Sequence, residues 1–345
     1  MPMRAVKICL VGFGNVGQAF ARLLERKTSA IEQQDQICLR ITAIATRAHG
    51  ACIKADGVDF PSALMKIQKN ESLNALSDYP LPSSTVEIIS QCGADVLLEN
   101  TPVNYLSGQP ALDHIATAIR AGMHAVTANK GPVLHGYQQL SALADERDRR
   151  FLFESSVMDG APIFSLFRRV LPAIELNGFE GILNSCTNLL LERMEGGDGF
   201  NQAVEYARSI GITETDPSGD IDGWDAAIKV AILVNVLMNF PLKIDEIERR
   251  GIREITAEDI CKVRAEGKRW KLICRAWRAA NSVKASVTPE IVTLQSPFFS
   301  VNGTSSSIVF KTDCLPGLGI LESNPGPETT AYGLLADILS IFADK

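Results

Sequence analysis

Acidic residues and a lysine gather where a short loop leads into a strongly apolar segment. The loop carries Glu214 and Asp220, and the apolar segment begins with Asp225 and Lys229. Residues four apart lie on one face of a helix, so we expect Asp225 and Lys229 to be neighbours. Residues 226–238 are apolar on nearly every side, which is typical of a buried helix. A buried ammonium group needs a carboxylate partner or loses its proton. The cluster therefore predicts either a structural ion pair or a site for proton transfer.

A second lysine, Lys130, follows residues 124–127, which we expect to form a strand. The carboxyl ends of parallel strands form the ligand-binding edge of a doubly wound sheet. One lysine at this edge and another beside an acidic loop suit the reduction of a carbonyl group, because a lysine can donate to the developing alkoxide. For Lys130 alone, a solvated loop position is the alternative.

A glycine-rich turn lies between a predicted strand at residues 6–11 and a predicted helix at residues 18–26. It matches the motif G-x-G-x-x-G, whose glycines allow a tight turn, a close approach of pyrophosphate and close helix packing. The pyrophosphate would lie at the helix N-terminus. The sequence thus predicts a dinucleotide site formed by Gly12, Phe13, Gly14, Asn15, Val16 and Gly17. Just beyond the strand predicted at residues 95–98, Asn100 and Thr101 are expected to bind the same cofactor, as is Lys130.

The end of the second predicted strand, residues 39–45, bears on the choice between NAD and NADP. NAD sites usually place Asp or Glu here to bind the ribose hydroxyls, whereas an arginine accommodates a 2′-phosphate. This chain continues with Thr46, Arg47, Ala48 and His49, which include one arginine and no acid. We therefore predict a preference for NADP, with NAD possible if Arg47 is merely solvent-exposed.

The arrangement of elements predicts how these residues are positioned. Strands and helices alternate over roughly the first 150 residues, which indicates an α/β fold with a doubly wound, Rossmann-like parallel sheet. Longer helices and strands of mixed length follow and predict a second, α+β domain. We expect a dinucleotide-binding domain at residues 1–153, a substrate domain at residues 154–329, and a closing helix at residues 330–345 that returns to the first domain.

Composition narrows the class of protein. The net charge of −6 argues against nucleic acid as a partner. No apolar run is long enough to cross a membrane, and no signal peptide precedes the first strand. Eight cysteines are scattered without a Cys-x-x-Cys pair, so neither a disulfide framework nor a zinc site is indicated. These observations predict a cytoplasmic protein.

Taken together, the motifs resemble the homoserine dehydrogenase family nearly from end to end. The matching segments are residues 12–17, 127–130, 154–157, 160–162, 184–188, 214–220, 223–229, 251–252, 255–256, 259–260, 330–331 and 337–338. The resemblance implies interconversion of L-homoserine and L-aspartate 4-semialdehyde with NAD(P), a step in threonine and methionine biosynthesis. It also implies a homodimer formed through the second domain.

The resemblance further implies roles for particular residues. Lys130 and Lys229 would flank the reacting oxygen and serve proton transfer. The substrate amino group would be bound, or Lys229 positioned, by Glu214, Asp220 and Asp225. A monovalent cation such as Na⁺ would be held by carbonyl groups near Glu154, Val157, Asp159 and Ala161.

The chain departs from the family pattern close to the expected substrate. Ser185 and Cys186, which we expect to contact the substrate, replace a glycine and a threonine, and Ile212 replaces a tyrosine. Two alternatives therefore stand beside homoserine dehydrogenase. One is a dehydrogenase of the same family for a different short aldehyde or hydroxy acid, and the other is a catalytically silent nucleotide-binding sensor.

Overall fold

The computed structural model describes residues 3–213 and 216–342. The chain divides into two compact units, one formed by Met1–Pro162 with Gly326–Lys345 and the other by Ile163–Pro325. The sequence placed these boundaries after residues 153 and 329. The turn after residue 153 belongs with the first unit because the short 3₁₀-helix Glu154–Ser156 is bonded to the closing helix α11 (Pro327–Phe342). The Glu154 N–H donates to Asp337 Oδ2 at 2.8 Å.

The first unit contains a six-stranded sheet in the order β3-β2-β1-β4-β5-β6. Its parallel strands are β1 (Arg4–Val11), β2 (Ile37–Ala45), β4 (Val96–Glu99), β5 (His124–Thr127) and β6 (Phe151–Leu152). The edge strand β3 (Ala51–Ile53) runs antiparallel to β2, so the sheet is mixed. The doubly wound α/β fold is confirmed. Strand order reverses between β1 and β4, which is where such sheets bind ligands.

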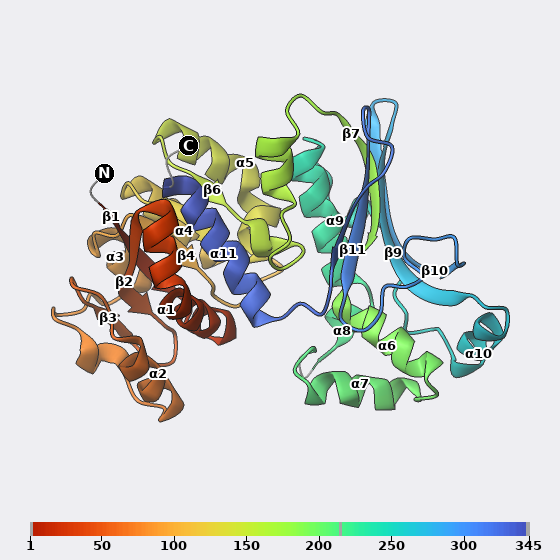
Figure 1. Cartoon of the computed structure of the whole chain (residues 1–345), viewed down its shortest axis with the longest axis horizontal. Coiled ribbons are helices and arrows are strands. Elements are labelled where there is room, and N and C mark those ends of the chain that lie inside the picture. Colours follow the sequence, from red (N-terminus) through yellow and green to blue (C-terminus); the bar gives the residue numbers. More distant parts are fainter. Residues whose placement is uncertain (1–2, 214–215, 343–345) are drawn as a thin grey trace. The chain divides into compact units, whose positions relative to one another are not determined.

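Helices flank this sheet. They are α1 (Asn15–Asp35), α2 (Phe60–Gln68), α3 (Thr85–Gln91), α4 (Ala111–Arg120) and α5 (Lys130–Glu146), with a 3₁₀ turn at Leu73–Leu76. The last helix, α11 (blue in Figure 1), lies against α1 (red), although more than 290 residues separate them. Leu334 and Ile338 of α11 share one apolar core with Ile8 and Leu10 of β1 and Phe20 of α1.

The second unit contains a six-stranded sheet in the order β12-β11-β7-β9-β10-β8. Its strands are β7 (Leu176–Ile182), β8 (Glu248–Arg249), β9 (Arg269–Ala279), β10 (Ser282–Val292), β11 (Ser306–Thr312) and β12 (Leu318–Glu322). Neighbours pair antiparallel except β8 and β10.

The helices of this unit are α6 (Ser185–Glu195), α7 (Phe200–Ser209), α8 (Ser218–Ile221), α9 (Trp224–Leu237) and α10 (Ala257–Ala265), with a 3₁₀ turn at Ile244–Glu246. Both α6 and α9 pack on β9. The sequence predicts a helix from about residue 161; in the structure a short helical segment covers residues 164–170 and ends in a π-helical turn at Leu166–Val170. Of the described helices, none combines the length and the apolar character needed to cross a bilayer.

Candidate active site

The glycine-rich turn is shaped by close backbone contacts on two sides. Gly12 has φ +93° and donates its N–H to the Ala45 carbonyl at 2.9 Å. A methyl group on Gly12 would lie 2.8 Å from the Thr101 nitrogen and still closer to the Asn100 carbonyl. A methyl group on Gly17 would overlap the Gly12 carbonyl. The loops after β1 and β4 are therefore pressed together, and only glycine fits these two positions.

Gly14 differs from Gly12 and Gly17, because no described atom apart from its chain neighbours lies within 4 Å of a methyl group placed on it. It is the N-cap residue of α1 and has no side chain to bond the first N–H groups of that helix. A helix N-terminus with open space in front of it is suited to bind phosphate.

Asn100 directly follows β4, and its side chain has an unmet requirement for hydrogen bonds. Its backbone N–H donates to the Val11 carbonyl at 2.7 Å. Both polar atoms of its side-chain amide are buried, and no described residue bonds them. A buried group without a partner costs about 1–3 kcal/mol, so the position calls for a ligand that donates and accepts. The turn and Asn100 together fit a dinucleotide with its carboxamide and ribose hydroxyls.

The loop after β2 contains the predicted determinant of cofactor choice. The Thr46 hydroxyl donates to the Gly50 carbonyl at 2.9 Å and accepts the His49 N–H at 2.9 Å, which closes the loop. Arg47 lies at the exposed tip. No carboxylate occurs between Thr46 and Gly50.

Lys130 is the first residue of α5 and is partly buried at the carboxyl edge of β5. The sequence predicts Lys130 at this edge, with a helix only over residues 137–147. In the structure α5 starts earlier because the Asn129 side-chain oxygen accepts the Gly131 N–H at 2.9 Å and caps the helix. The Asn129 amide also donates to the Thr101 carbonyl at 3.0 Å. Asn129 thus connects the start of α5, where Lys130 lies, to Thr101, which is expected to bind the cofactor.

The second unit brings a lysine and carboxylates together at the start of α9. Lys229 Nζ lies 3.3 Å from Asp225 Oδ2, and each side chain is 13% exposed. Nζ also donates to the Leu183 carbonyl at 2.6 Å. The N-cap residue of α9 is Gly223, whose φ of +80° suits glycine. The expected i,i+4 neighbours are therefore in contact and largely shielded from water.

Asn184 links the two aspartates of this cluster. Its side-chain amide donates to Asp220 Oδ1 at 2.7 Å and to Asp225 Oδ2 at 3.0 Å. Its oxygen accepts the Thr187 N–H at 2.8 Å and so caps α6. Burial, and next the charge of Asp225, raises the pKa of Asp220. A cation arriving here would meet two carboxylates whose mutual repulsion it would relieve. Glu214, predicted to belong to this cluster, lies outside the described residues.

The two unusual residues at the start of α6 have different surroundings. Cys186 is buried, and its thiol pKa is raised by burial and then by the charge of Asp220. A thiol held in this form is a poor nucleophile. The Ser185 hydroxyl lies 3.3 Å from the Ser306 hydroxyl. Ser185 is therefore bonded to β11, while Cys186 adjoins the acidic cluster.

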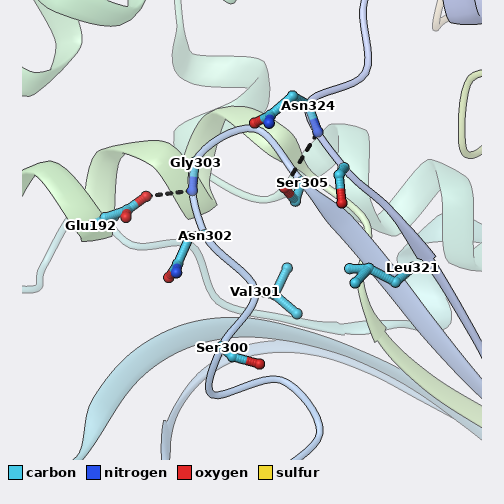
Figure 2. A pocket seen from close by; sticks show the side chains of 9 residues that line it. Glu192, Ser300, Val301, Asn302, Gly303, Ser305, Leu321 and Asn324 are labelled. Carbon is cyan, nitrogen blue, oxygen red and sulfur yellow. Dashed lines mark hydrogen bonds between the residues drawn. The ribbon is translucent and has the colours of Figure 1, made fainter.

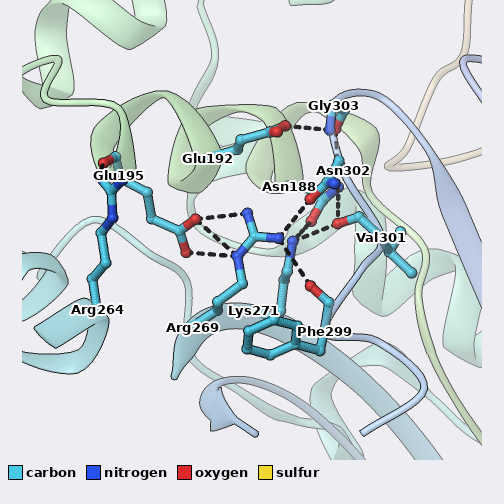
Figure 3. A network of polar contacts seen from close by, with 10 residues as sticks. All are labelled: Asn188, Glu192, Glu195, Arg264, Arg269, Lys271, Phe299, Val301, Asn302 and Gly303. Carbon is cyan, nitrogen blue, oxygen red and sulfur yellow. Dashed lines mark hydrogen bonds and ion pairs between the residues drawn. The ribbon is translucent and has the colours of Figure 1, made fainter. Parts of the chain in front are cut away.

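A polar network further along α6 was missed by sequence reasoning (Figure 3). The run of basic residues at 262–278 predicts a strand or helix with a solvated face, yet Lys271 is fully buried. Its Nζ donates to Asn188 Oδ1 at 2.7 Å and to the Val301 carbonyl at 2.5 Å. Arg269 forms an ion pair with Glu195 through its Nε and Nη2 groups and also donates to the Phe299 carbonyl. These contacts tie the loop after β10 to α6.

A pocket of about 320 Å³ opens beside this loop (Figure 2). Its walls are polar and apolar in nearly equal measure, and the Glu192 carboxylate accepts the Gly303 N–H. The described lining residues include none of the predicted site residues; they are Glu192, Ser300, Val301, Asn302, Gly303, Ser305, Leu321, Ser323 and Asn324.

The turn after β6 contains the residues expected near a cation. Glu154, Val157 and Ala161 are buried, and Asp159 adopts a φ of +32°. Asp159 Oδ1 accepts the Thr330 hydroxyl at 2.5 Å, which fixes the turn on α11. Within residues 3–213 and 216–342, no three His, Cys, Asp or Glu side chains form a metal-binding group. Most ligands of a cation bound at this turn would therefore be backbone carbonyl oxygens.

The first unit has the switch point, glycine turn and unpaired amide of a dinucleotide site, and the second has a shielded lysine beside carboxylates. This combination defines an NAD(P)-dependent oxidoreductase.

Comparisons with known proteins give the family. The family model "Homoserine dehydrogenase, NAD binding domain" matches residues 12–154, and the model "Homoserine dehydrogenase" matches residues 162–339. The NAD(+)-dependent homoserine dehydrogenase of Pseudomonas canavaninivorans is 35% identical over 98% of this chain and 97% of its own length. The homoserine dehydrogenase of Methanocaldococcus jannaschii is 34% identical over 97% of this chain and 98% of its own length.

A solved structure supports the same assignment. A hyperthermophilic archaeal homoserine dehydrogenase in complex with NADPH superimposes with a TM-score of 0.80 at 29% identity, covering 98% of this chain and 97% of that one. The chain belongs to the homoserine dehydrogenase family, which confirms the resemblance seen in the sequence.

Proposed function

We propose that this protein is an NADP-preferring homoserine dehydrogenase that interconverts L-homoserine and L-aspartate 4-semialdehyde. The observation that carries the proposal is the cluster of Asp220, Asp225 and Lys229 joined by Asn184. The carboxylates suit the ammonium group of an amino-acid substrate, and the lysine suits its oxygen. The bound cofactor would supply or accept the hydride.

Each group then has a distinct task. Lys130 and Lys229 act on the reacting oxygen, donating to it when the aldehyde is reduced and accepting its proton in the reverse direction. Asp220 binds the substrate amino group, together with Glu214. Asp225 contributes to that binding and also holds Lys229 in place, since it lies 3.3 Å from the ammonium nitrogen. Ser185 and Cys186, at the start of α6 beside this cluster, contact the substrate and adjust the shape of its binding site.

Arg47 supports the preference for NADP. It is exposed at the end of β2, and no carboxylate in that loop could bind the ribose hydroxyls. Relatives differ in this respect, since the Pseudomonas canavaninivorans enzyme is named as NAD(+)-dependent and the archaeal structure contains NADPH. The preference therefore depends on local residues such as Arg47.

The first test is the oxidation of NADPH and of NADH with L-aspartate 4-semialdehyde. We expect kcat/KM to be at least about tenfold higher with NADPH, because the guanidinium pairs with the 2′-phosphate. Arg47→Ala should raise the KM for NADPH and leave the KM for NADH nearly unchanged. A wild-type enzyme that prefers NADH would contradict the proposed preference for NADP and would leave the proposed substrate unaffected.

A lysine variant separates an enzyme from a silent sensor. Lys229→Ala should lower kcat by about 10²–10⁴-fold, the usual contribution of a positioned proton donor. NADPH binding should stay within about twofold, because Lys229 belongs to the unit without the glycine turn. Lys243→Ala, at an exposed lysine, is the control. A wild type that binds NADPH but reduces no member of a panel of short aldehydes would support the sensor instead.

Two further parts of the proposal come from the family resemblance. A monovalent cation such as Na⁺ would bind carbonyls of the turn containing Glu154, Val157, Asp159 and Ala161, and the protein would form a homodimer through its second unit. Replacing Na⁺ by tetramethylammonium should lower activity if the cation site is real. Light scattering at micromolar concentration should give twice the mass of the chain if the dimer forms.

A further inference from the structure

Glu99, the last residue of β4, is a fully buried acid. We propose that Glu99 is a positioning residue that holds the loops after β4 and β5 in the arrangement required by the cofactor and by Lys130; the role assigned to Lys130 rests on the proposed function. Glu99 lies at the sheet edge where the order of strands reverses, directly before Asn100 and Thr101.

The carboxylate gathers donors from both loops. Oε1 accepts the Thr101 N–H at 3.1 Å and also the Thr101 hydroxyl. Oε2 accepts the Thr127 hydroxyl at 3.3 Å, and that hydroxyl also reaches the Glu99 carbonyl at 2.8 Å. His114 Nδ1 lies 3.6 Å from Oε1. Thr101 follows β4 and Thr127 ends β5, so one side chain fixes two neighbouring strand ends.

Hydrogen bonds continue from this carboxylate to the start of α5. The Thr127 hydroxyl accepts the Asn129 N–H at 2.9 Å. Asn129 in turn caps the helix at Gly131 and donates to the Thr101 carbonyl at 3.0 Å. These hydrogen bonds form a closed ring through Glu99, Thr127, Asn129 and Thr101. Lys130 directly follows Asn129 in the sequence. A shift of the carboxylate would therefore move both Lys130 and the backbone beside Asn100.

The chemistry of these contacts explains why an acid occupies the position. Three donors point at the two oxygens, and a carboxylate accepts all of them. Glutamine has the same shape but offers an NH₂ group in place of one oxygen. With its NH₂ group toward Thr101 it would set a donor against the Thr101 N–H and hydroxyl. With its NH₂ group toward Thr127 it would lose the shared bond from that hydroxyl, which would then donate only to the Glu99 carbonyl. In both orientations the loss of the negative charge weakens the remaining bonds. Glu99→Gln therefore changes the hydrogen bonds and leaves the packing nearly intact.

The test compares Glu99→Gln with wild type. We expect NADPH affinity, measured by fluorescence titration, to fall about tenfold, and kcat to fall by about 10–100-fold, because displacement of a reacting group by about 1 Å costs that much. The pH profile of kcat should also shift, since Lys130 moves. Asp95→Asn is the matched control: Asp95 is exposed at the opposite end of the same strand and accepts one N–H, from Lys7. It should leave all three quantities within about twofold.

A second comparison separates positioning from simple loss of stability. Ile115→Val removes a methylene from a fully buried side chain in α4 that takes no part in the ring, so it lowers stability without moving Lys130. Its kcat and pH profile should match wild type. Should Glu99→Gln fail to fold, Thr127→Val removes one hydroxyl at constant shape, and we expect the same loss of affinity and kcat.

Folded Glu99→Gln or Thr127→Val protein with NADPH affinity, kcat and pH profile within about twofold of wild type would overturn the proposal. The binding measurement keeps the proposal distinct from the choice of substrate. Weakened NADPH binding in Glu99→Gln, with no wild-type turnover of L-aspartate 4-semialdehyde, would support the positioning of the cofactor loops and refute homoserine dehydrogenase activity.

Discussion

Two largely buried lysines of the second unit differ in what their ammonium groups contact. Lys229 lies 3.3 Å from the Asp225 carboxylate, in the acidic cluster proposed to bind substrate. Lys271 contacts the amide oxygen of Asn188 and the Val301 carbonyl, which are uncharged. Burial, assisted by the nearby charge of Arg269, lowers the pKa of Lys271 to about 8. Lys271, held by uncharged groups that fix a loop, therefore has a structural role. Lys229, which lies beside a carboxylate, is suited to proton transfer.

The lowered pKa of Lys271 predicts a pH-dependent contribution to stability. Between pH 8 and the usual lysine pKa near 10.5, the unfolded chain holds the proton more tightly than the folded one. The free energy of unfolding contributed by Lys271 therefore increases with pH across this window, by at most about 3 kcal/mol. Urea unfolding of wild type and Lys271→Met at pH 7, 8, 9 and 10 should show a difference that shifts in favour of wild type. A constant difference would contradict the prediction, and Lys262→Met, at an exposed lysine, is the control.

Within the glycine turn of the first unit, neighbouring positions are constrained for different reasons. Gly12→Ala places a side chain at φ +93° and against the backbone of Asn100 and Thr101, so the free energy of unfolding should fall by about 2 kcal/mol or more. Gly14→Ala meets no described atom of the protein, so its Tm should change by no more than about 2 °C. Both should lose NADPH binding, because the methyl group at Gly14 takes the space proposed for the pyrophosphate. Thermal unfolding with and without NADPH measures both effects, and an equal loss of stability would contradict this explanation.

The elements themselves were largely predictable, but their starting points and long-range contacts were not. Alternating apolar strands and the glycine turn are local signals, and they indicated the first sheet correctly. The start of α5 depends on the cap at Asn129, which precedes the apolar periodicity by several residues. The sequence indicates Asn184 only as part of the segment at residues 184–188, because its contact with Asp220 joins residues 36 positions apart. The burial of Glu99 and Lys271 likewise depends on which loops fold over them, which no local pattern encodes.

At the scale of the whole molecule, the first unit is built from both ends of the chain. The closing helix α11 contributes Leu334, Leu335, Ile338 and Phe342 to the core that contains β1 and α1. Each such side chain stabilises the fold by about 1.5–3 kcal/mol when buried. Hydrogen bonds from Glu154 to Asp337 and from Ser155 to Thr330 fasten the turn after β6 to the same helix. The dinucleotide site therefore depends on residues that follow the second unit in sequence.

This dependence predicts how fragments of the chain should behave. Residues 1–162 alone should bind the dye ANS and fail to bind NADPH, because the apolar surface covered by α11 is exposed. Residues 1–162 joined by a short Gly/Ser linker to residues 326–345 should fold and bind NADPH within about tenfold of the full protein. A short linker suffices because Gly160 packs directly against Thr329. The joined fragment should have no dehydrogenase activity, since it lacks Lys229, Asp220 and Asp225. Circular dichroism, ANS fluorescence and NADPH titration check these outcomes. If residues 1–162 alone bound NADPH with the same affinity as the joined fragment, α11 would be dispensable for the nucleotide site. The contribution of the C-terminal residues to this unit would then have no effect on cofactor binding.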